Sequence, residues 1–241
     1  MLVFSPMEAY VIYPIFSLNF VINNVIFYLL LAGFLTLLLG KGIKKGNIIS
    51  NNWGIISESL FRTILLMIEN VVGPKMSIYL PLFYSIFHIV LFSNLLGLVP
   101  YSTTPTVELV MTLSIAFTLL MGLLLVGFLT HKLYLLAIFL PGGTPLALIP
   151  IMVALEVIAY IFRTISLGLR LAINLITGHL LLKVVIGFIW LGYIKGTSFF
   201  ILAIPLILLT IFLSLEILIA YLQAYILIFI TIITLKDVTM S

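Results

Sequence analysis

The segment that decides the fold is "IMVALEVIAYIFRTISLGLRLAINLITGHLLLKVVIGFIWLGYI", residues 151–194. It is apolar over most of its length and contains no proline, which predicts one continuous helix. A helix of about 40 residues is about 60 Å long at 1.5 Å per residue, twice the hydrocarbon thickness of a bilayer of about 30 Å. Such a helix must tilt steeply or kink in a membrane. Its glycines, Gly168, Gly178 and Gly187, permit bending.

A second apolar stretch, residues 207–236, is also free of proline. The intervening "GYIKGTSFF", residues 192–200, has the composition of a connection. The C-terminal part of the chain is therefore predicted to form a hairpin of two long, steeply tilted helices.

The composition places the whole chain in a membrane. Of its 241 residues, 64% are hydrophobic and 7% are charged, whereas soluble domains carry about 25% charged residues. We therefore predict an all-α integral membrane protein with a single membrane domain over residues 1–241. Cysteine is absent, which excludes disulfides and cysteine nucleophiles. No basic segment interleaved with aromatic residues indicates nucleic-acid binding.

Three shorter spans and one surface helix are predicted before the hairpin, so that about five helices are embedded in the membrane. The spans are residues 21–39, 78–99 and 107–130, and the surface helix is residues 53–72. Lys41, Lys44 and Lys45 follow the first span. The positive-inside rule puts them on the matrix or cytoplasmic side and the N-terminus on the opposite side.

The surface helix is predicted from its amphipathic pattern. At 100° per residue, Glu58, Arg62 and Glu69 fall within about 40° of each other, opposite an apolar face that includes Ile64. Glu58 and Arg62 also have the i,i+4 spacing of an ion pair. We interpret these charges as a solvated face, with the helix lying on the bilayer surface on the side of the lysines.

Two polar residues, His88 and Asn94, lie within the span predicted over 78–99. A single polar side chain in an apolar helix is usually packed and hydrogen-bonded inside the protein. We therefore expect both residues to be structural.

Polar residues recur on one face of the first long helix. Glu156, Arg163 and Arg170 are seven residues apart. Asn174 and Thr177 extend the row, and all five fall within a sector of about 60°. The regular spacing indicates a stripe that faces something other than lipid.

The second long helix carries a matching stripe. Glu216, Gln223 and Asp237 are separated by seven and fourteen residues and share one face. Asp237 lies near the end of its helix, where its carboxylate could reach the membrane interface.

The two arginines raise the question of what neutralises them. A charged side chain at the middle of a membrane costs at least about 2.5–3.5 kcal/mol on insertion scales, and arginine does not release its proton. Arg163 is expected to pair with Glu156 on its own helix. The nearest charge to Arg170 on the same face is another cation, Arg163. Its carboxylate is therefore expected to come from a second protein.

His179 and Glu216 are the two residues whose chemistry suits proton transfer. Histidine titrates near neutral pH, and a neighbouring carboxyl group can exchange a proton with it through hydrogen-bonded water. A structural hydrogen bond between the two is the alternative interpretation.

Three motifs together resemble one family. The stretch "SLGLRLAINLITGH", the downstream "LEILIAYLQAYIL" and the earlier "FSNLLGLVPYSTTPT" are similar to subunit a of the F-type ATP synthase, in its mitochondrial form. The resemblance extends over nearly the whole chain, and "FSPMEAY" near the start resembles the fungal members.

The resemblance implies a role for each polar residue. It implies that Arg170, Asn174 and Gln223 face a rotating c-ring and that Arg170 separates two half-channels. His179 and Glu216 would form the half-channel from the intermembrane side. A second set would form or support the matrix-side half-channel: Glu156 and Asp237, with Arg163 in support.

The resemblance also implies a setting for the protein. It would be a non-catalytic, multi-pass subunit of the mitochondrial inner membrane, with its N-terminus on the intermembrane side. Its partners would be the c-ring, the peripheral stalk, small membrane subunits, protons and the lipid bilayer. No cofactor and no metal are expected.

Three other classes of protein fit the sequence less well. An ion-coupled transporter, or an antiporter-type subunit of a respiratory complex, is typically built from inverted repeats with broken helices, and the sequence has no internal repeat. An intramembrane hydrolase would need a nucleophile motif such as G-x-S-x-G, which is absent. A purely structural scaffold fits the composition but leaves Arg170 unexplained.

Overall fold

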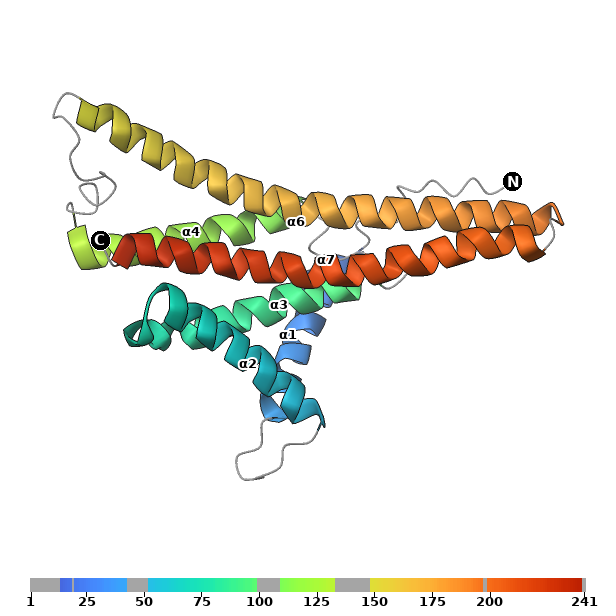
Figure 1. The fold of residues 1–241 in the computed structure, drawn as a ribbon, viewed down its shortest axis with the longest axis horizontal. Helices are drawn as coiled ribbons and strands as arrows, with labels where there is room; N and C mark the ends of the chain where they lie inside the picture. The colour runs from blue at the N-terminus through green and yellow to red at the C-terminus, as the bar shows by residue number, and fades with distance from the viewer. Residues whose placement is uncertain are drawn as a thin grey trace.

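Helices α6, Ile149–Ile194, and α7, Phe199–Thr239, are the longest elements of the chain. The computed structural model describes residues 14–18, 20–42, 52–98, 109–132, 148–196 and 199–239. The two helices run antiparallel and are joined by a short connection, which confirms the predicted hairpin (Figure 1). At 46 residues, α6 is about 69 Å long at 1.5 Å per residue. It bends near its middle, so that it lies beside α7 at the end near their connection and diverges from it at the other (Figure 1).

The ends of the two long helices differ from the predicted bounds. Helix α6 begins at Ile149 with Pro150 in its first turn, where a missing N–H costs nothing. Helix α7 begins at Phe199 rather than at 207, and Pro205 lies inside it. A proline removes one backbone hydrogen bond, but helices in membranes tolerate it.

Helix α4, Leu109–His131, fills the space where α6 and α7 diverge. The two helices lie close together at Gly168 of α6, where an added Cβ would lie 3.1 Å from the Cα of Leu113 and 3.3 Å from the carbonyl oxygen of Thr112. The absence of a side chain at Gly168 therefore lets two helix backbones meet. Bending was the role expected of this glycine, and the structure gives it a packing role.

Helix α2, Asn52–Val71, and helix α3, Leu80–Gly97, pack on the other side of α7. A short 3₁₀ helix, η2, Pro74–Tyr79, connects them. The apolar face of α2 is buried against both partners through a cluster that includes Ile64, Ile68, Phe83, Phe87, Ile228 and Ile232. Glu58, Arg62 and Glu69 are exposed, as the amphipathic pattern predicted. The predicted pair of Glu58 with Arg62 does not form.

Helix α1, Asn24–Gly42, packs on α2 and α3, and a small antiparallel hairpin of β1, Pro14–Leu18, and β2, Phe20–Asn23, precedes it. The two strands are the one departure from the all-α class within the described residues. Their sequences, "PIFSL" and "FVIN", are rich in aromatic and β-branched residues, which favour strands. Lys44, Lys45 and the N-terminal "FSPMEAY" lie outside the described residues.

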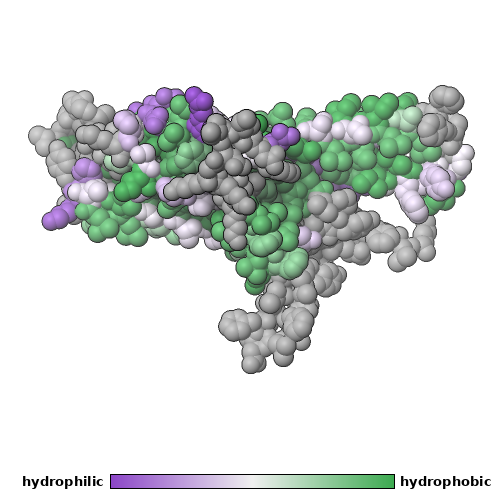
Figure 2. Space-filling model, turned by 90° about the horizontal axis from the view of Figure 1, so that it is seen from below, coloured by the Kyte–Doolittle hydropathy of each residue, from purple (hydrophilic) through white to green (hydrophobic). Residues whose placement is uncertain are grey.

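The outer surface is apolar. Four helices are long and apolar enough to cross a membrane, namely Met76–Gly97, Leu109–His131, Ile149–Ile194 and Leu202–Val238, and α1 adds a shorter apolar stretch, Ile26–Leu38. Among the coloured atoms of the face in Figure 2, hydrophobic residues predominate, and the most hydrophilic residues lie mainly towards the left end. The prediction of an all-α, multi-pass membrane protein is confirmed.

Candidate functional site

The two arginines of α6 have different surroundings. Arg163 Nη1 lies 3.5 Å from Asp237 Oδ2 of α7, and this is the one salt bridge within the described ranges. The prediction that Glu156 would pair with Arg163 was therefore wrong. The true partner lies on another helix, which spacing along α6 could not reveal.

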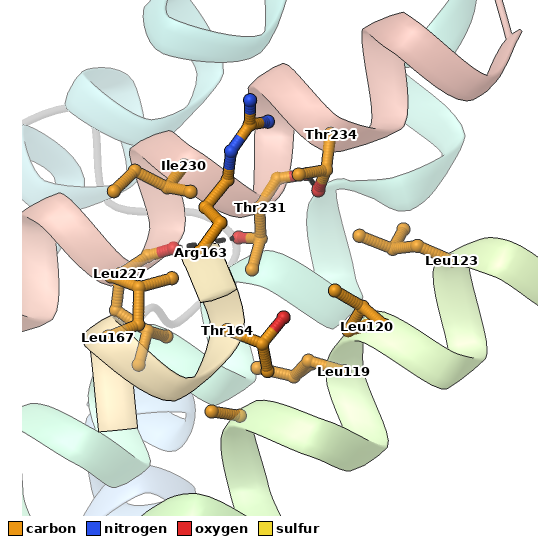
Figure 3. A pocket seen from close by; sticks show the side chains of 11 residues that line it. Leu119, Leu120, Leu123, Arg163, Thr164, Leu167, Leu227, Ile230, Thr231 and Thr234 are labelled. Carbon is orange, nitrogen blue, oxygen red and sulfur yellow. Dashed lines mark hydrogen bonds between the residues drawn. The ribbon is translucent and has the colours of Figure 1, made fainter. Parts of the chain in front are cut away.

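A small cavity of about 20 Å³ lies beside Arg163, where α4, α6 and α7 meet. Figure 3 shows Arg163 extending from α6 past Ile230 and Thr231 of α7, with Leu120 of α4 on the other side of the cavity. The ring of Tyr160 lies 5.3 Å from the guanidinium carbon of Arg163, at the range of a cation–π contact. The arginine is thus held by an anion and an aromatic face together.

Arg170, two turns further along α6, is exposed and forms no ion pair with any residue that the structure describes. Its neighbour in the chain, Leu171, is buried and packs in the hydrophobic cluster with α2, α3 and α7. Arg170 therefore projects from a rigid helix towards the outside of the chain. The expectation that no carboxylate of its own helix neutralises it agrees with this geometry.

A second cavity, of about 200 Å³, lies between α3, α6 and α7. Four of the predicted site residues line it: Asn174 and His179 from α6, and Glu216 and Gln223 from α7. The structure thus brings together residues that are up to 49 positions apart in the sequence (223 − 174). The volume is sufficient for several water molecules, each of which needs polar partners such as these.

His179 and Glu216 line the same cavity but do not form a hydrogen bond with each other. Nε2 of His179 and both carboxylate oxygens of Glu216 are buried and have no hydrogen-bond partner among the described residues. Buried polar groups of this kind are typically satisfied by water or engaged in chemistry. A water-mediated contact between the two therefore fits the geometry better than the structural hydrogen bond that was the alternative.

The carboxyl group of Glu216 lies against Gly178, the residue before His179. A Cβ built on Gly178 would be 2.6 Å from Oε1 and 3.1 Å from Cδ of Glu216. The carboxyl group thus occupies the space that any other residue would fill with its side chain. Nothing comparable surrounds Gly187, where a built Cβ meets no atom within 4 Å.

Asn94 of α3 is a lining residue that the sequence did not assign to the site. It is 1% exposed, and its Nδ2 donates a hydrogen bond to the carbonyl oxygen of Ala220 on α7 at 3.3 Å. Its Oδ1 has no hydrogen-bond partner in the part of the chain that the structure describes, and the residue lines the larger cavity. The prediction that Asn94 is packed and hydrogen-bonded was correct, and no sequence signal separated this role from a place in the cavity.

His88 is structural, as predicted. It is 1% exposed, and its Nδ1–H donates to the carbonyl oxygen of Tyr84 at 2.8 Å. Its ring packs against Tyr84 and Phe87, with centroids 4.1 and 5.3 Å away. This residue does not line the cavity that holds His179.

Glu156 is half-buried on α6, two turns before Arg163, and Tyr160 lies between them. Its assignment to a path with Asp237 remains a prediction. Within the ranges that the structure describes, His, Asp and Glu side chains form no group of three that could hold a metal ion.

Comparison with known proteins identifies one family. The family model of the ATP synthase A chain matches residues 21–236. ATP synthase subunit a of Zancudomyces culisetae is 35% identical over 98% of both chains. The subunit a of Neurospora crassa is 37% identical over 98% of this chain and 94% of its own, and that of Podospora anserina is 38% identical over 92% and 85%.

Proposed function

The chain belongs to the ATP synthase A chain family, and from this membership we propose that it is the proton-translocating stator subunit of a rotary ATP synthase. It works as a component of that complex, where it conducts protons and does not itself make ATP. The transporter and antiporter alternatives are not favoured, because the matching relatives are ATP synthase subunits.

The observation that carries the mechanism is the contrast between Arg163 and Arg170. Arg163 has a fixed anion in Asp237, whereas Arg170 is exposed and unpaired within the described chain. A guanidinium in a membrane needs a counter-charge. The carboxylates of a rotating c-ring supply it in turn, each pairing with Arg170 as it passes.

Arg170 then determines where each carboxyl group of the rotor is ionised and where it is protonated. An ion pair at 4 Å is worth about 4 kcal/mol at an effective dielectric constant of 20, which favours the ionised form of a carboxylate that reaches the arginine. Away from Arg170, a carboxyl group must be neutral before it can enter lipid. The fixed positive charge also repels protons and so blocks a direct leak between the two half-channels.

Protons reach the rotor through the larger cavity. His179 and Glu216 exchange a proton by way of water and pass it towards Asn174 and Gln223, which line the same cavity beside the rotor. The carboxylate of the c-ring accepts the proton there. After nearly a full turn it releases the proton on the other side of Arg170, past Glu156 and Asp237.

The location, orientation and partners of the chain are inferred from the same family. We place the chain in the mitochondrial inner membrane, with the N-terminus on the intermembrane side, because lysines follow the first span and favour the matrix. The c-ring lies along the exposed stripe that contains Arg170. The peripheral stalk and small membrane subunits cover other faces.

The test is ATP-driven proton pumping by the intact complex in membrane vesicles. Arg170→Ala should assemble and lose pumping, because no other residue replaces the positive charge. Arg170→Lys should also be strongly impaired, because lysine lacks the planar fork and can lose its proton when desolvated. Arg62→Ala is the matched control, since Arg62 is exposed and unpaired on α2. Normal pumping by Arg170→Ala would rule out the proposed function.

A further inference from the structure

The carboxyl group of Glu216 lies where a side chain at position 178 would begin. Both of its oxygens are buried and have no hydrogen-bond partner among the residues that the structure describes. A Cβ built on Gly178 would meet Oε1, Cδ and Cγ of Glu216 at 2.6, 3.1 and 3.4 Å, so the missing side chain of Gly178 leaves the space that this group occupies. A carboxyl group placed in this way is free to accept and release a proton without breaking a hydrogen bond to the protein.

We propose that Gly178 is the positioning residue for proton uptake: its missing Cβ sets the depth at which the carboxyl group of residue 216 sits beside His179. The proposal rests on the proposed function, because it assigns a role within the same proton path. It predicts that the length of the side chain at position 216 is matched to the absence of a Cβ at position 178.

This match follows from the distances between Glu216 and a Cβ built on Gly178. A Cβ at 178 would lie 2.6 Å from Oε1, closer than real Cβ contacts allow, so the carboxyl group must move. Because the obstacle is the far end of a flexible side chain, α6 and α7 need not separate. The cost of Gly178→Ala therefore falls on the position of the carboxyl group and not on the packing of the helices. Aspartate at 216 is one methylene shorter and withdraws the carboxyl group from the added Cβ.

The experiment compares four intact complexes in vesicles: the parent, Gly178→Ala, Glu216→Asp and the double variant. Each single variant should assemble and pump more slowly, by up to about a hundredfold, which is the loss that a misplacement of about 1 Å can cause. The double variant should pump about threefold faster than Gly178→Ala, because neighbouring residues that share one space do not act additively. A double variant that pumps no faster than Gly178→Ala overturns the proposal.

Gly187→Ala is the matched control, because it makes the same change in the same helix where a Cβ meets nothing. It should leave pumping unchanged, and a loss equal to that of Gly178→Ala would show that backbone flexibility is the cause. If Gly178→Ala fails to assemble, the double variant should restore assembly together with pumping. A double variant that also fails to assemble overturns the proposal.

The Arg170→Ala complex separates this inference from the proposed function. If Arg170→Ala pumps normally, the function itself is wrong. If Arg170→Ala is inactive and Gly178→Ala pumps at the parent rate, the function stands and the role of Gly178 is wrong.

Discussion

Arg163 Nη1 lies 3.5 Å from Asp237 Oδ2, and this contact joins the first half of α6 to the last turns of α7. The two side chains are 35% and 42% exposed in the isolated chain, so the pair lies at the edge of the helix bundle. Removing one partner from such a pair leaves a charge without its counter-ion in a chain that lies in a membrane, which is unfavourable.

We therefore expect Arg163→Gln and Asp237→Asn each to lower the thermal stability of the complex. The double variant should be more stable than the sum of the two single effects predicts, because it leaves no lone charge. Graded heating followed by native electrophoresis measures the surviving complex. Strictly additive effects would show that the two charges do not interact.

The crossing of α4 and α6 at Gly168 predicts a packing defect. Gly168→Ala places a Cβ 2.9 Å from Leu113 Cδ2 and 3.1 Å from its Cα, and the backbone of α4 cannot yield as a side chain can. Overpacking of this kind costs about 1–3 kcal/mol. The amount of complex and its melting temperature should both fall. Gly122→Ala on α4 is the control, since a Cβ there meets nothing within 4 Å.

The exchange of His179 and Glu216 tests whether the two act as a pair. Each single change, His179→Glu or Glu216→His, leaves the cavity with two groups of one kind and should nearly abolish pumping. The double exchange keeps one imidazole and one carboxyl group and should pump faster than either. The measurement is the initial rate of proton pumping in vesicles, compared between the double exchange and each single variant. If the double exchange is no faster, the residues are not a relay.

His88 and His179 are predicted to respond differently to the same substitution. His88→Phe should keep most of the pumping rate, because the ring packs in an aromatic cluster and its loss removes one hydrogen bond, worth about 1 kcal/mol. His179→Phe should abolish pumping, because phenylalanine carries no proton. Equal losses in the two variants would contradict the structural role of His88.

Asn94 is predicted to contribute to the proton path, even though it was expected only to pack. Asn94→Leu keeps a similar volume and removes a polar group from the lining of the cavity, so pumping should fall several-fold while the complex still assembles. Ser93→Ala changes the adjacent buried residue and is the control. An unchanged rate in Asn94→Leu would limit this residue to packing.

The sequence was informative where one helix could be considered by itself. The proline-free length of two segments predicted the hairpin, which the structure confirms. The spacing of Glu156, Arg163 and Arg170 predicted a shared functional face, and this stays a prediction. The sequence did not predict contacts between helices. The partner of Arg163 is on α7, and periodicity along α6 carries no information about it. The same limit applies to Gly178, whose importance depends on the reach of Glu216 from the opposite helix, and to Asn94, which reaches the cavity from α3.

The wall of the larger cavity comes from α3, α6 and α7, and α7 is the last of these to be synthesised. Glu216 and Gln223 arrive only with that final helix. A chain that ends before α7 therefore lacks one wall of this cavity and two of its polar lining residues.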